Sequence, residues 1–78
     1  MRNIGKELKK KLNKIGIETA EDLKKLGSKD AFFRLKVTYP EVCLVHLYCL
    51  QGAIDNTEYN QLSENLKADL KKFSDSLK

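Results

Sequence analysis

The fold is decided by the stretch VCLVHLYCL at residues 42–50, which is apolar at nearly every position. Its composition suits a buried strand or a buried helix. The flanking sequence has helical periodicity, so a single strand at 42–50 would have no partner strand. Thr38 and Glu41 also have capping-box spacing around Pro40, which favours the start of a helix. We therefore expect a helix over about residues 41–53. A helix that is apolar on all sides must lie at the centre of its domain.

Outward from this stretch, apolar residues repeat with the spacing of amphipathic helices. Towards the N-terminus they predict a helix over about residues 5–14. Two further helices are expected, one capped by Thr19 and the next by Ser28. The helix capped by Ser28 should end before Pro40. A short helical turn is expected at about 58–62, and a last amphipathic stripe then runs to the C-terminus. Together these patterns predict one all-α domain of about five helices over residues 1–78. The final stripe consists of Leu62, Leu66, Leu70, Phe73 and Leu77.

The charge is distributed unevenly along the chain. The 78 residues carry a net charge of +4, but residues 1–39 carry +6 and residues 40–78 carry −2. This asymmetry indicates a basic surface and a polyanionic partner, although solvated lysines on a small helical domain give the same pattern. No apolar run approaches the roughly 18 residues of a membrane-spanning helix, and none follows the N-terminal basic residues as in a signal peptide. We therefore expect a cytoplasmic protein without a membrane partner.

The sequence offers little for catalysis. Cys43 and Cys49 are six residues apart, which on a helix is too far for a disulfide and does not match a metal-ligand spacing. We interpret them as buried free thiols, which suit a reducing cytoplasm. The one histidine, His46, has apolar neighbours and is interpreted as a packed, hydrogen-bonded residue of the core helix and not as a catalytic one. We expect no catalytic residue, no cofactor and no metal ligand, and hence a protein that is not an enzyme.

The candidate functional site lies at the basic N-terminal segment. Gly5 opens a helix, so free backbone N–H groups would point outward at the positive end of the helix dipole, with lysines just behind them. This arrangement suits phosphate groups. In the alternative interpretation, Gly5 only permits a tight turn and the lysines only keep the helix in water. The candidate nucleic-acid-binding residues are Asn3, Ile4, Gly5, Lys6, Lys9, Lys10 and Lys14.

These residues also carry a resemblance to a known family. The segments N-I-G at 3–5, G-I-x-T at 16–19, R-L-K at 34–36 and L-x-G-A at 50–53 resemble the C-terminal domain of the TfoX/Sxy family, from about residue 2 to about residue 69. The resemblance implies an all-helical fold related to helix-hairpin-helix and SAM-like domains. It also implies a bacterial protein with a role near transcriptional regulation and natural competence. The usual hairpin motif has glycine where this chain has Asn3, a residue that tolerates left-handed backbone angles.

The sequence is compatible with two functions. The first is a DNA-associated regulatory module that binds weakly and without sequence preference. The second is a protein-interaction or dimerisation module that binds a regulatory protein or a second copy. An apolar patch left exposed after the core is filled, for instance at Phe33 or Tyr59, would favour the second function.

Overall fold

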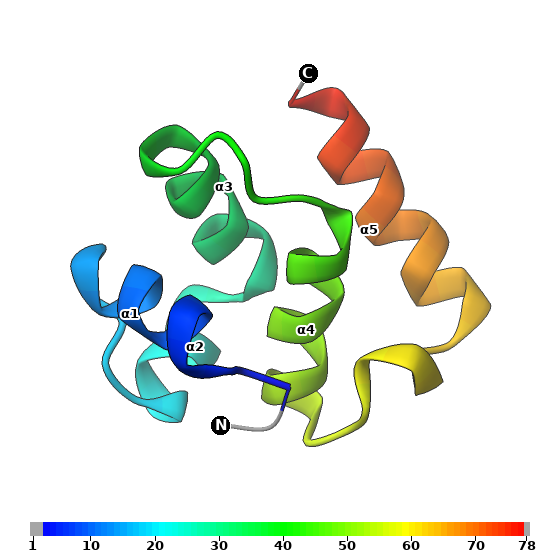
Figure 1. Ribbon diagram of the computed structural model, residues 1–78. Coiled ribbons are helices and arrows are strands. Elements are labelled where there is room, and N and C mark those ends of the chain that lie inside the picture. The colour runs from blue at the N-terminus through cyan, green and yellow to red at the C-terminus, as the bar shows by residue number, and fades with distance from the viewer. Residues whose placement is uncertain (1–2, 78) are drawn as a thin grey trace.

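The computed structural model describes residues 3–77, and all the regular structure in that range is helical. Five α-helices and one 3-10 turn pack into a single body (Figure 1). The expected all-α fold of about five helices is therefore confirmed. The elements are α1 (Lys6–Lys14), α2 (Ala20–Leu26), α3 (Ser28–Thr38), α4 (Leu44–Asp55), η1 (Tyr59–Gln61) and α5 (Glu64–Ser76).

Helix α4 is the centre of the domain, as its all-round apolar sequence predicts. It packs against α2, α3, η1 and α5, and in Figure 1 it lies between the α1–α3 group and α5. Leu47 and Leu50 are completely buried. Because one helix contacts nearly all the others, the packing of α4 holds the whole domain together.

The start of α4 differs from the expectation. The helix begins at Leu44 and not near residue 41, and Thr38 is the last residue of α3, so the expected Thr38–Glu41 capping pair is wrong. The reason lies in the connection after α3. The Lys36 Nζ donates hydrogen bonds to the carbonyls of Pro40, at 3.1 Å, and Val42, at 2.7 Å. These bonds hold residues 40–42 in a turn, so α4 begins only after this turn, at Leu44.

Two other expected caps have different outcomes. Thr19 caps α2 as predicted, because its Oγ1 accepts a hydrogen bond from the Asp22 N–H at 3.1 Å while Asp22 Oδ2 accepts one from the Thr19 N–H at 3.2 Å. The predicted cap at Ser28 is wrong. Gly27 precedes α3, and the buried Ser28 hydroxyl donates instead to Gln51 Oε1 of α4 at 2.5 Å.

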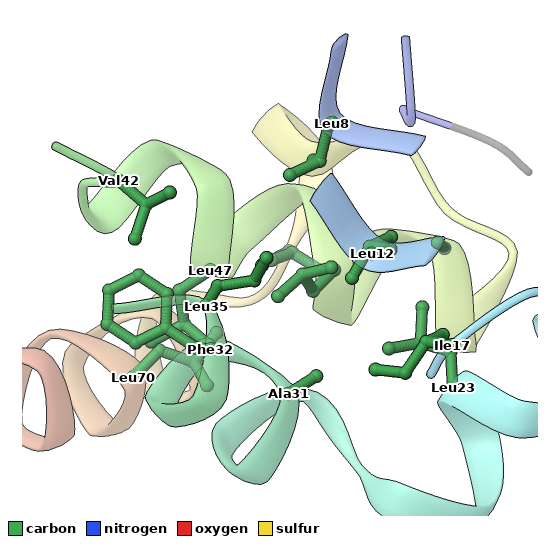
Figure 2. Packing of buried hydrophobic residues seen from close by; sticks show 13 residues of the cluster. Leu8, Leu12, Ile17, Leu23, Ala31, Phe32, Leu35, Val42, Leu47 and Leu70 are labelled. Atoms are coloured by element: carbon green, nitrogen blue, oxygen red, sulfur yellow. The ribbon is translucent and has the colours of Figure 1, made fainter. Parts of the chain in front are cut away.

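The predicted apolar stripes converge on one core, shown in Figure 2. Leu8 and Leu12 enter it from α1, and Leu70 enters it from α5. The final stripe is only partly buried, since Leu66, Phe73 and Leu77 pack at the edge of the core. The buried cluster is Leu8, Leu12, Ile17, Leu23, Ala31, Phe32, Leu35, Val42, Leu47, Leu50, Ala53, Leu62 and Leu70.

Candidate nucleic-acid interface

Helix α1 presents a face of lysines to solvent. Leu8 and Leu12 turn into the core, and Lys6, Lys10 and Lys14 repeat four residues apart on the opposite side of the helix. All three are exposed, and so is Lys9, which lies nearer one edge of this face. The structure therefore brings the four predicted lysines onto one short helix. We call Lys6, Lys10 and Lys14 the lysine row.

The lysine row carries an energetic cost for the helix. Like charges four residues apart destabilise a helix by about 0.2–0.5 kcal/mol for each pair, and the row contains two such pairs. A bound anion would relieve this repulsion.

Lys11 interrupts the run of lysines and has a different role. Its side chain is half-buried, and its Nζ lies 3.3 Å from Glu41 Oε1 and 5.3 Å from the centre of the Tyr39 ring. The backbone N–H of Glu41 and the Lys11 ammonium hold the pKa of the Glu41 carboxyl below its ordinary value. Lys11 therefore ties α1 to the turn before α4 and is not part of the lysine row.

The N-terminus of α1 is open, as the sequence predicts. Gly5 precedes the helix in an extended conformation, and no side chain caps the N–H groups of the first turn. A Cβ atom built on Gly5 would meet nothing within 4 Å. Ile4, in contrast, packs against the core and offers only its backbone to this surface.

Asn3 takes a structural part that the sequence does not reveal. Its φ of +67° confirms that it stands in the left-handed conformation expected of the motif's glycine. Its Nδ2 donates to the Thr57 carbonyl at 2.8 Å, and its Oδ1 accepts from the Tyr59 N–H at 3.2 Å. The side chain thus fastens the start of α1 to the loop after α4. We call this pair of hydrogen bonds the Asn3 latch, and it engages both polar atoms of the Asn3 side chain within the domain.

His46 is hydrogen-bonded, as interpreted from the sequence, but it is not a core residue. The side chain is half-buried at the first turn of α4, and its Nδ1 accepts a hydrogen bond from the Cys43 N–H at 3.0 Å. His46 is therefore a capping residue. Burial of the ring, together with the Lys11 ammonium, holds the pKa of His46 below its ordinary value, and the Glu41 carboxylate opposes this shift.

The cysteines also depart from the expected pattern. Cys43 is exposed where α4 begins, while Cys49 is half-buried against the core. Both thiols are free. Burial raises the pKa of the Cys49 thiol, with a smaller contribution from Cys43. Only Cys49 therefore resembles the buried thiol that the sequence suggests.

The cap at His46 predicts a pH-dependent stability. A nitrogen that accepts a hydrogen bond must be unprotonated, and the folded-state pKa of His46 lies below the unfolded value of about 6.5. The unfolded chain therefore binds the proton more readily. We expect the contribution of His46 to the free energy of unfolding to be fully present above about pH 7.5 and to be lost as the pH drops through the folded-state pKa.

The variant His46→Gln isolates this effect, because a glutamine at the same position accepts the Cys43 N–H bond without titrating. Urea unfolding at pH 7.5 and pH 5.5 should show a smaller loss of stability for this variant than for the parent, with similar stability at pH 7.5. An equal loss of stability in both proteins would show that other groups cause it.

A second feature on this side of the molecule is apolar. Phe33 and Val37 lie one turn apart on the outer face of α3, with 49% and 68% of their surface exposed. They line a hollow of about 400 Å³ together with Lys14, Ile15, Arg34 and Thr38. Tyr59 is exposed as well, at 40%. Both residues that the sequence singled out for an exposed patch therefore stand at the surface.

The motifs, the all-helical fold and the basic first helix define a class of protein, the small helical domains of the TfoX type. The chain matches the TfoX C-terminal domain family over residues 1–74 and belongs to it. The resemblance expected from the sequence is thereby confirmed. No functionally curated protein matches the chain.

Two solved structures from Listeria monocytogenes resemble this domain throughout. One is the triclinic crystal form of an uncharacterised protein, with a TM-score of 0.97 and 44% identity over 99% of this chain and 88% of that one. The other is the tetragonal form of a protein of unknown function, with a TM-score of 0.95 and 45% identity over 97% of this chain and 93% of that one. No helix in residues 3–77 has the length and apolar character needed to cross a bilayer.

Proposed function

We propose that this TfoX C-terminal domain is a binding module that associates with the phosphate backbone of DNA. The observation that carries the proposal is the lysine row of α1, which stands on the face opposite Leu8 and Leu12. Lys9 and the open N–H groups behind Gly5 extend the same surface. The expected role near transcriptional regulation and competence, in a bacterial cytoplasm, is consistent with such binding.

The proposed binding is electrostatic. Lysine ammonium groups on flexible stems act as point charges that contact phosphates and do not read base edges. The surface therefore provides affinity without sequence preference. The protein contributes binding and no catalytic step.

The proposal predicts the strength and salt dependence of DNA binding. Four lysines that neutralise four phosphates should give a log–log salt slope of about −3.6 and a Kd of about 10⁻⁴ to 10⁻⁶ M at physiological salt. The triple variant Lys6→Gln, Lys10→Gln, Lys14→Gln should weaken binding by more than about tenfold and reduce the slope to about −1. Fluorescence anisotropy with a labelled duplex at several salt concentrations measures both quantities.

A matched control removes the same charge elsewhere. Lys67→Gln, Lys71→Gln, Lys72→Gln on α5 also lowers the net charge by three, but should leave the slope near that of the parent. If the two triple variants weaken binding equally, only net charge is being measured and the site on α1 is wrong. If the parent binds no duplex at ~20 mM salt, the DNA proposal fails.

The second candidate function, a protein-interaction module, is favoured by a different observation. Phe33 and Val37 form an exposed apolar pair on α3, in a hollow that Lys14 at the end of α1 also lines. Exposed apolar patches with polar rims are typical of partner-binding surfaces.

A further inference from the structure

The outer face of α3 is unusual for a helix at the surface. One side of α3 is completely buried and consists of Ala31, Phe32 and Leu35. The opposite side carries a second, exposed apolar strip, formed by Phe33 and Val37. Four-residue spacing sets these two side chains one above the other along the helix. Such an i, i+4 pair is the pattern by which one helix packs on another.

The rim of this strip is basic and unpaired. Two nearby cations have partners of their own: Lys29 pairs with Asp69 at 2.7 Å, and Lys36 donates to two backbone carbonyls. Within residues 3–77, the side chains of Lys14 and Arg34 have neither an ion-pair nor a hydrogen-bond partner. Both line the hollow that contains Phe33 and Val37.

We propose that the hollow between the end of α1 and the outer face of α3 binds an acidic amphipathic helix of a partner protein. Apolar side chains of that helix would cover Phe33 and Val37, and its carboxylates would face Lys14 and Arg34. Charge complementarity selects this occupant. Asp30, the acid on the first turn of α3, lines a different hollow beside α5 and does not oppose it.

Two other occupants fit less well. A second copy packed symmetrically on this face would bring Lys14 and Arg34 of one subunit close to the same cations of the other, which is unfavourable. A nucleic acid would satisfy the two cations but would leave Phe33 and Val37 without an apolar partner. The proposal goes beyond the DNA-binding role and does not depend on it.

The test uses designed peptides of about 15 residues, long enough to hold helical structure. The first peptide is an amphipathic helix with leucines on one face and glutamates flanking them. The second keeps the leucines but replaces glutamate with lysine, and the third keeps the glutamates but replaces leucine with alanine. We expect NMR titration of the labelled protein to show binding of the first peptide only, with shifts centred on Phe33, Arg34, Val37 and Lys14.

Variants locate the surface. The double variant Phe33→Ser, Val37→Ser should bind the first peptide at least about tenfold more weakly, while the protein keeps its helicity. The pair Val45→Ser, Tyr59→Ser, which changes two other exposed apolar residues, should leave the affinity unchanged. The pair Lys6→Gln, Lys10→Gln, which reduces DNA binding under the proposed function, should also leave it unchanged.

Three results would overturn the proposal. Equal binding of the glutamate–alanine peptide would show attraction by charge alone. Equal loss in the Phe33/Val37 and Val45/Tyr59 variants would place the peptide elsewhere. If light scattering detects a dimer of the parent protein and only a monomer of the variant Phe33→Ser, a second copy of the chain occupies the hollow.

Discussion

Replacement of Phe32 by alanine is expected to lower the free energy of unfolding by about 3–5 kcal/mol. The Phe32 side chain is completely buried, and Figure 2 shows its ring within the cluster that includes Leu47 and Leu70. Alanine would leave a cavity among these residues, which come from three different helices. Since a domain of this size is stabilised by only about 4–12 kcal/mol, the variant should be close to unfolding. Urea denaturation followed by circular dichroism measures the loss.

The adjacent residue provides the control for this experiment. Phe33 has the same chemistry but faces solvent, so Phe33→Ala should change the free energy of unfolding by less than about 0.5 kcal/mol. If Phe32→Ala does not fold, Phe32→Leu should give a smaller loss of about 1 kcal/mol that is still measurable. Similar losses for Phe32→Ala and Phe33→Ala would contradict the orientation of α3.

Replacement of Gly52 by alanine is the second large effect, and its sign is diagnostic. In the interior of a helix this change normally stabilises a protein by about 1 kcal/mol. Here the new Cβ would lie 2.6 Å from the Thr57 carbonyl oxygen and would also clash with the Asn3 amide. Because a backbone atom would have to move, we expect a loss of about 2–3 kcal/mol in the free energy of unfolding.

Two further variants test the origin of the Gly52 effect. Gly5→Ala introduces a Cβ into open space at the start of α1 and should cost less than about 1 kcal/mol. The variant Asn3→Gly lacks the side-chain amide of Asn3. In this background, Gly52→Ala should lower the free energy of unfolding by less than in the parent, because one of its two clashes is gone. Additive losses for the Asn3 and Gly52 changes would show that the amide does not take part in the clash.

The features that sequence predicted well depend on local patterns. The stripe of Leu8 and Leu12 fixed which face of α1 is buried, and hence which lysines face water. The all-round apolar composition of α4 indicated its central place. In both cases the periodicity of a single helix carries the information, and no distant residue is needed to interpret it.

The features that sequence missed depend on contacts between distant or differently oriented residues. His46 has apolar neighbours in sequence, but α4 begins only at Leu44, so His46 falls in the first turn, where a capping side chain is needed. That start depends in turn on the bonds from Lys36 to the preceding turn. The bond from Asn3 to Thr57 spans 54 residues, and no local pattern indicates it.

The Asn3 latch has a consequence for the order in which the chain folds. Closing a flexible loop of 54 residues costs about 3.5 kcal/mol in chain entropy, while a hydrogen bond contributes only about 1 kcal/mol. Two such bonds are too weak to bring these segments together in an unfolded chain. The latch therefore forms after the core has assembled and belongs to the final stage of folding. Its loss would accelerate unfolding and leave the folding rate nearly unchanged.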